Sequence, residues 1–256
     1  MRVLFVAGEV APFSEVAETA RLLRTLPEAV QEHADVEPRI LMPRYGVVSE
    51  RRNRLHEVIR LSGEEIAAGG ASDKLSVKVA SIPGIRLQVY FMDSPVFFKR
   101  KGLHQDRKTE AVFEDNPARA LFFARAALST TRRLGWSPDV VHAAGWMSAF
   151  VPYVLREEFG EDELFADAKS VYTPDVVEGF EPMLSADEAT ELGLPADWAD
   201  TSLRHIGLST ADAAAYAAPD AAADGEPEAA SLNASASPDA LAADAAALYA
   251  ATGVTA

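Results

Sequence analysis

The chain has 256 residues, a formal net charge of −15 and no cysteine. The absence of cysteine excludes a disulfide framework and a thiolate metal site. The negative charge argues against a nucleic-acid partner, because binding a phosphate backbone requires clustered Lys and Arg. No run of about 18 apolar residues is present that could span a membrane. We therefore expect a cytoplasmic protein that binds neither nucleic acid nor membrane.

The first 46 residues have the pattern of a β-loop-α-β unit. Val3 to Ala7 is a continuous apolar run typical of a strand buried on both faces, and residues 15–29 carry apolar side chains at helical spacing. Val36 to Met42 predicts a second strand. This opening predicts an α/β fold with a doubly wound, mostly parallel Rossmann-like sheet. A dinucleotide fingerprint is absent, because Gly8 is the only glycine in the first loop.

The middle of the chain predicts an edge hairpin, a long loop and a helix. The runs 75–82 and 85–92 alternate apolar with polar residues around the turn Pro83-Gly84, which indicates a β-hairpin at the sheet edge. Residues 95–115 form a charged loop longer than a compact domain usually tolerates without a functional reason. We expect Asn116 to cap the helix that follows, which has Pro117 at its first position.

The run from Pro138 to Met147 is the most informative stretch. A Pro-Asp turn starts a short apolar strand that ends at small residues and Trp146, and a helical pattern follows. In open parallel sheets ligands bind just beyond such strand ends. We therefore expect one wall of any site here.

The composition changes near residue 209. Ala, Asp, Ser, Pro and Glu dominate from there to the end, with little bulky apolar surface. We expect a folded domain at residues 1–208 and a weakly ordered, Ala/Asp/Ser-rich tail at residues 209–256.

Several stretches together resemble the N-terminal, starch synthase catalytic domain of bacterial ADP-glucose-type glycogen and starch synthases. The chain is especially similar to the short single-domain members of that group. The resemblance is carried, in collinear order, by residues 9–13, 41–46, 97–102, 113–119, 138–146 and 171–173.

The resemblance implies the N-terminal half of a GT-B glycosyltransferase, without the C-terminal half. In this family glucose passes from ADP-glucose to the non-reducing end of an α-1,4-glucan with retention of configuration, without a metal or other cofactor. The implied partners are an α-glucan or ADP-glucose, and a second chain that supplies the missing lobe. The implied substrate-binding residues are Glu9, Tyr45, Arg100, Asp115, Asn116, Arg119 and Trp146, and His142 is the one catalytic candidate.

Several of these residues also have an ordinary structural interpretation. A single His at a strand end is more often a satisfied core residue, so His142 has both interpretations. Trp146 would stack on a sugar or pack against the following helix. Asn116 and Arg119 would serve as a helix cap and a surface ion pair.

The sequence departs from the family pattern in its donor loop and in its catalytic motif. The family's Lys-Thr-Gly-Gly is replaced by Glu15-Val16-Ala17-Glu18, and two carboxylates facing a diphosphate would repel it. The second His and the Asp of His-x-His-Asp-Trp are replaced by Ala144 and Gly145.

Two further departures concern the remaining ligands and the second lobe. Ile-His-Asn is replaced by Pro174-Asp175-Val176, and no pattern of a second Rossmann half follows residue 210. Transition-state stabilisation requires donors already fixed in a water-excluded site. We therefore predict that the chain alone is inactive.

Three functions follow as alternatives. The chain is half of a retaining hexosyltransferase that needs another chain, or a non-catalytic binder of a glucan or of a partner enzyme of glycogen metabolism. A free-standing nucleotide-sugar enzyme with relocated catalytic groups is the third. We disfavour the third, because no other acid/base pair or nucleophile is expected to converge at the strand ends.

Overall fold

The computed structural model describes residues 1–218, 222–223, 225–227 and 229–254 of the chain. Within them the strands are β1 (Arg2–Ala7), β2 (Glu37–Pro43), β3 (His56–Glu57), β4 (Glu65–Ala68), β5 (Ala71–Lys74), β6 (Ser76–Ser81), β7 (Gln88–Asp93), β8 (Val140–Ala144), β9 (Lys169–Thr173), β10 (Met183–Leu184), β11 (Thr201–Ser202), β12 (Ala213–Tyr216) and β13 (Ala230–Ser231). The α-helices are α1 (Thr19–His33), α2 (Glu50–Asn53), α3 (Pro95–Phe98), α4 (Asn116–Leu134), α5 (Val151–Phe159), α6 (Ala186–Leu192), α7 (Leu203–Thr210) and α8 (Pro238–Ala251).

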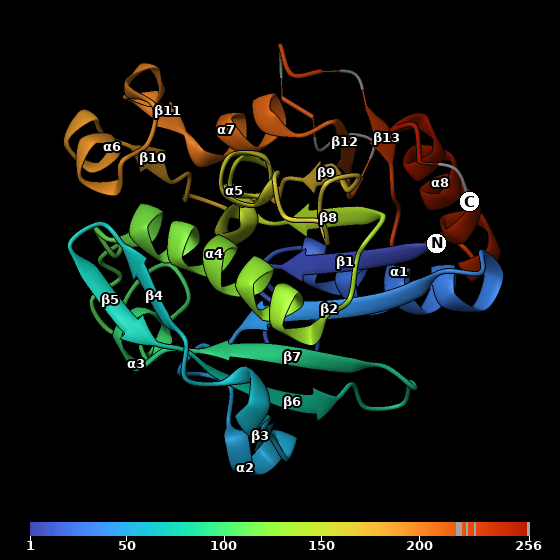
Figure 1. Cartoon of the computed structure of the whole chain (residues 1–256), viewed down its shortest axis with the longest axis horizontal. Helices are drawn as coiled ribbons and strands as arrows, with labels where there is room; N and C mark the ends of the chain where they lie inside the picture. Colours follow the sequence, from blue (N-terminus) through green and yellow to red (C-terminus); the bar gives the residue numbers. More distant parts are fainter. Residues whose placement is uncertain (219–221, 224, 228, 255–256) are drawn as a thin grey trace.

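A central sheet organises the molecule (Figure 1). Among the described residues it has nine strands in the order β13-β12-β9-β8-β1-β2-β7-β6-β3. The neighbours from β13 to β7 are parallel, and β6 and β3 add an antiparallel edge. The predicted doubly wound, mostly parallel sheet is therefore confirmed. The predicted hairpin is also present, as β6 and β7 joined through Ser81 and Gln88.

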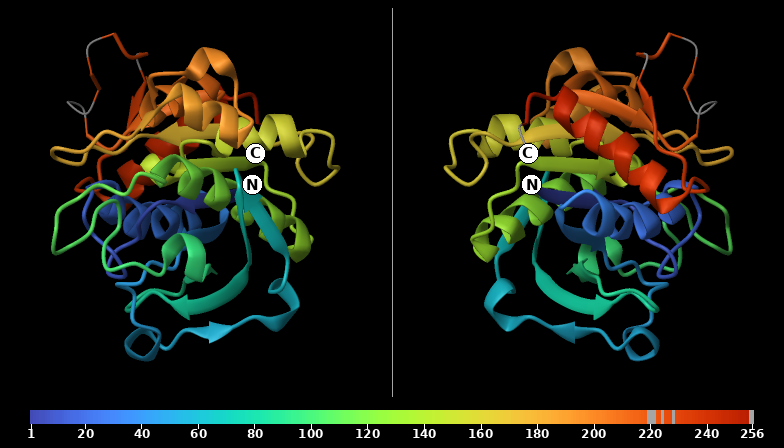
Figure 2. Two further views of the ribbon diagram at one scale, coloured as in Figure 1. Left: turned by 90° about the vertical axis from the view of Figure 1, so that its left-hand side faces the viewer. Right: turned by 90° about the vertical axis from the view of Figure 1, so that its right-hand side faces the viewer.

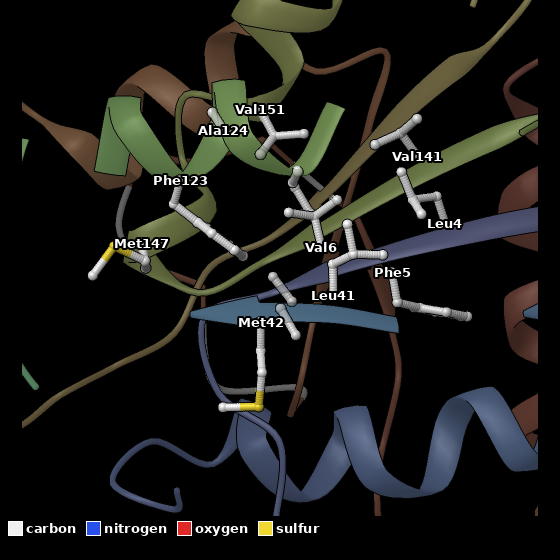
Figure 3. Close-up of a cluster of buried hydrophobic side chains, with 14 of the residues drawn as sticks. Leu4, Phe5, Val6, Leu41, Met42, Phe123, Ala124, Val141, Met147 and Val151 are labelled. Atoms are coloured by element: carbon white, nitrogen blue, oxygen red, sulfur yellow. The ribbon is translucent and has the colours of Figure 1, made fainter. Parts of the chain in front are cut away.

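Helices cover both faces of the sheet. In Figure 3, Phe123, Ala124 and Val151 from α4 and α5 lie on the side of the sheet opposite to α1. Alternation along β1 sends Leu4 and Val6 to one face and Phe5 to the other, and all three are fully buried. The core thus has two apolar layers, one on each side of the parallel strands.

The helix after the long loop begins where the sequence predicts, but its cap is different. Asn116 is the first residue of α4, and Asp115 is the N-cap residue, without a side-chain capping bond. The prediction that Asn116 caps the helix is therefore wrong. Its side chain is buried and bonds to the carbonyl oxygen of His104 instead.

The segment beyond residue 208 adds regular structure to the sheet. β12 pairs with β9, and α8 packs against α1, as Figures 1 and 2 both show. Leu241, Ala245 and Tyr249 of α8 are buried. The division of the chain into a domain at residues 1–208 and a tail stays a prediction, and its test follows in the Discussion. Residues 219–221, 224, 228 and 255–256 of that tail lie outside the described residues.

None of the helices in the described part of the chain combines the length and the apolar character needed to cross a bilayer.

Candidate functional site

The loops that leave β1, β8 and β9 meet at one edge of the sheet. The backbone N–H of Gly8 donates to Ala144 O at 2.7 Å, and that of Gly145 donates to Thr173 O at 2.9 Å. Gly145 has a φ of +85°, a conformation that favours glycine. These bonds hold the carboxyl ends of three neighbouring strands close together, at the edge where ligands of open α/β sheets bind.

A cavity of about 660 Å³ opens beyond β8 and β9, and we call it the strand-end cavity. Its chemically informative lining residues are Trp146, Asp175, Phe180, Glu181, Arg204 and Glu226. A second cavity of about 680 Å³ lies between β12, β13 and α8 and is lined largely by alanine. It lies away from the assembled strand ends, so the strand-end cavity is the better candidate.

Asp175 is the most unusual group in the strand-end cavity. Its Oδ1 accepts the backbone N–H of Trp146 at 2.9 Å. Burial disfavours the charged form and raises the pKa of the Asp175 carboxyl to about 7, and the nearby charge of Glu9 acts in the same direction. Perturbed carboxyl groups of this kind are concentrated at functional sites.

Arg204 and Glu226 form a largely buried ion pair in the same wall. Nη2 of Arg204 lies 2.7 Å from Oε2 of Glu226, and Nε bonds to the other carboxylate oxygen. Their side chains are only 14% and 13% exposed. Nη1 of Arg204 also donates to the carbonyl oxygen of Asp175 at 3.1 Å. The pair therefore joins α7, the loop after β9 and residue 226 into one wall.

An aromatic group completes the strand-end cavity. Trp146 is buried, with 5% of its surface exposed. Phe180 meets it edge-on at 5.3 Å between ring centroids, and His104 stacks on Phe180 at 4.2 Å. Phe180 is the more accessible of the two aromatic rings that line the cavity. The structure thus places Trp146 at the site but largely covers it.

Glu9 and Tyr45, two of the predicted binding residues, brace the loop after β1. Glu9 is buried, and its carboxylate accepts the backbone N–H groups of Val16 and Ala17 at 2.9 and 3.1 Å. Burial raises the pKa of Glu9. The Tyr45 hydroxyl donates to Gly8 O at 2.9 Å. Both lie near the strand ends, and neither is among the residues that line the strand-end cavity.

The other four predicted binding residues form a separate cluster that fixes the long loop. Arg100 binds Asp115 through two hydrogen bonds. Arg119 is fully buried and donates to Phe97 O at 2.8 Å, and to Leu103 O and Asn116 Oδ1 at 2.6 Å each. Among the described residues no carboxylate pairs with Arg119, and burial lowers its pKa to about 10. The cluster is connected to the strand-end cavity through His104, whose carbonyl accepts from Asn116 and whose ring stacks on Phe180.

His142 does not reach the strand-end cavity. It lies in β8 with no exposed surface. Its Nδ1 is 2.9 Å from the Tyr249 hydroxyl, and its Nε2 is 2.8 Å from Oγ1 of Thr173. Burial lowers its pKa to about 3, so the ring is neutral. Both ring nitrogens are occupied within the core, which gives His142 a structural part in holding α8 to the sheet.

The sequence patterns did not predict a role for Phe180, Arg204 or Glu226. Asp175 was considered only as a replacement for a family residue. Its position just after a buried strand nevertheless indicates a site residue. The expectation that no acid/base pair or nucleophile converges at the strand ends stays a prediction. Asp175 and Glu226 line one cavity there, and Glu226 is paired with Arg204. In the described part of the chain, no three His, Cys, Asp or Glu side chains are grouped to hold a metal ion.

The chain is similar to known proteins of one family. Residues 2–220 match the family model described as starch synthase catalytic domain. Glycogen synthase of Pelodictyon phaeoclathratiforme is 37% identical over 172 residues, which are 67% of this chain and 35% of that protein. Glycogen synthase of Chlorobium phaeobacteroides is 38% identical over the same share of each chain. The chain thus spans about a third of the length of these relatives.

A solved structure of low sequence identity has the same fold. It is the catalytic domain of starch synthase IV from Arabidopsis thaliana bound to ADP and acarbose, with a TM-score of 0.64 and 20% identity. The match covers 85% of this chain and 45% of that chain. The described fold is that of the N-terminal half of a GT-B starch synthase.

Proposed function

The chain belongs to the starch synthase catalytic domain family, and we propose that it is a glucan-binding lobe of that family that does not transfer glucose by itself. The observation that carries this proposal is the chemistry of the strand-end cavity. Two aromatic rings, the carboxyl groups of Asp175 and Glu181, and the Arg204–Glu226 ion pair line it. Such walls suit the hydroxyl groups and apolar faces of a sugar better than a diphosphate.

The acidic loop that leads into α1 supports weak binding of the donor. A helix N-terminus normally attracts phosphate through its free N–H groups. Here the carboxylate of Glu9 already accepts from Val16 and Ala17, and the exposed carboxylates of Glu15 and Glu18 lie beside the first turn. Two like charges about 4 Å apart repel by roughly 1 kcal/mol in water, and the ion pair of Glu15 with Arg21, at 2.6 Å, reduces the repulsion further. A diphosphate approaching this loop would meet repulsion of that order.

The absence of a second lobe within these residues supports the lack of transfer activity. In a two-lobed glucosyltransferase the reacting groups are held in a cleft between the lobes, where charges are already fixed before the reaction. The described residues form one lobe, and His142, the one catalytic candidate, is sealed in its core.

A second candidate function is activity in combination with another chain. Val16, Val96 and Val176 follow the ends of β1, β7 and β9 and are 54%, 47% and 64% exposed. Apolar side chains exposed along one edge of a sheet are typical of an interaction surface. This edge is where a second lobe would sit, so the chain would then be one half of a retaining hexosyltransferase. For either function, we propose that the protein acts in the cytoplasm.

Titration calorimetry with maltoheptaose and with ADP-glucose tests the proposal. We expect the purified chain to bind maltoheptaose and to show at least tenfold weaker binding of ADP-glucose. Binding of ADP-glucose that equals or exceeds that of maltoheptaose would refute the proposal. Binding of neither ligand would leave the two-chain function as the account to pursue.

A further inference from the structure

Gly145 and Asp175 share one small volume at the strand ends. A Cβ atom built on Gly145 would lie 3.0 Å from Oδ2 of Asp175, which is closer than ordinary van der Waals contact. The same atom would lie 3.7 Å from the Cα atom of Gly8. The space in which a side chain at position 145 would begin is therefore occupied by the carboxyl group of Asp175.

Asp175 is held in this position from two sides. Its Oδ1 accepts from Trp146, and its carbonyl oxygen accepts from Arg204. Within the described residues no other residue donates a hydrogen bond to Oδ2, although the backbone N–H of Asp175 itself also interacts with the carboxyl group. Asp175 lines the strand-end cavity, so Oδ2 is an open acceptor at its wall.

The two positions lie close together because their strands are adjacent. β8 and β9 are parallel neighbours in which Ala144 pairs with Thr173. Position 145 directly follows β8, and position 175 follows β9 by two residues. A side chain from either loop can thus enter the same volume.

We propose that Asp175 supplies, from the loop after β9, the carboxyl group that the family pattern carries at position 145, and that its Oδ2 binds a ligand hydroxyl group in the strand-end cavity. This inference rests on the proposed glucan-binding function for its ligand. The exchange of position rests on the resemblance at residues 142–146 and on the short distance between position 145 and the Asp175 carboxyl group.

Binding of maltoheptaose by two variants tests the role of Asp175. Asp175→Asn keeps an oxygen for the Trp146 N–H and replaces the open acceptor by a donor. At pH 8.5, above the Asp175 pKa of about 7, we expect about tenfold weaker binding, since a charge-assisted hydrogen bond is lost. The matched control is Glu178→Gln, which removes an exposed carboxylate from the same loop but outside the cavity lining, and it should change affinity less than twofold. Equal affinities of wild type and Asp175→Asn would overturn the inference.

A double-mutant cycle tests the exchange without any ligand. Gly145→Asp should lower the melting temperature strongly in the wild type, because of the Asp175 carboxyl group and the left-handed backbone. In an Asp175→Gly background the same change should cost clearly less, since only the backbone strain remains. Equal losses in both backgrounds would refute the shared volume. If wild type fails to bind maltoheptaose, the proposed function fails, and this cycle still decides whether the carboxyl group has moved.

Discussion

Acidification tests the burial of His142 most directly. His142 is neutral in the folded chain, with a pKa of about 3, against about 6.5 for an unfolded histidine. The folded-state pKa is the lower one, so the stabilisation is complete above pH 6.5 and is lost as the pH falls toward 3. The loss is about 1.4 kcal/mol for each pH unit, or ~2.7 kcal/mol between pH 6.5 and pH 4.5. That is a large part of a typical domain stability of roughly 5–15 kcal/mol.

Urea denaturation at pH 7.0, 5.5 and 4.5 measures this term. The carboxyl groups also titrate in this range, but their contribution cancels when wild type is compared with His142→Gln. We expect the variant to be less stable at pH 7 and to lose less stability on acidification, by about 1.4 kcal/mol per pH unit. His56→Gln is the matched control, because His56 is exposed on β3. A His142→Gln variant with the pH slope of the wild type would refute the reasoning.

Three further predictions concern α8 and the donor loop. Tyr249→Phe removes the hydroxyl that bonds to buried His142, so the free energy of unfolding should fall by ~1–3 kcal/mol, as measured by urea denaturation. An unchanged free energy of unfolding would mean that this bond does not hold α8. A chain ending at residue 210 exposes the surface that α8 covers, including the contacts of Leu241 and Tyr249, and should lose ~3–6 kcal/mol. Full stability and a native circular dichroism spectrum of that shortened chain would support the boundary at residue 208 instead. Replacing Glu15 by Lys together with Glu18→Gly should strengthen ADP-glucose binding at low salt by about tenfold, and the gain should vanish in 1 M KCl; no gain in calorimetry would contradict repulsion at α1.

The sheet could be predicted from the sequence because its strands are continuous apolar runs. The apolar runs Val3 to Ala7 and Val140 to Ala144 carry apolar side chains on both faces of the strand, which favours burial of both faces. Both strands are buried in the structure. α8 is indicated in the sequence by its start at Ser237-Pro238-Asp239, although alanine gives little periodic contrast along the helix. A few specific contacts hold α8 in place. One of them is the hydrogen bond between Tyr249 and His142, which lie 107 residues apart in the sequence.

The site was predictable only in its position. The strand ends were expected to form a wall, and Trp146 and Asp175 lie there. Arg204 and Glu226 are 22 residues apart and pair across a loop, a contact that no local pattern encodes. Arg100, Asp115, Asn116 and Arg119 stay predictions as ligand-binding residues. In the structure their polar groups bond mainly to one another and to backbone carbonyls of the long loop.

Glucose transfer by the purified chain alone is the most direct test of the central claim. The assay follows ADP release and incorporation of labelled glucose from ADP-glucose into glycogen, at low salt and in 1 M KCl. We predict that the folded chain, shown to bind maltoheptaose in the same preparation, gives no transfer above the protein-free control. Sustained transfer in proportion to protein concentration would contradict the account, and would show that these residues by themselves assemble a complete active site.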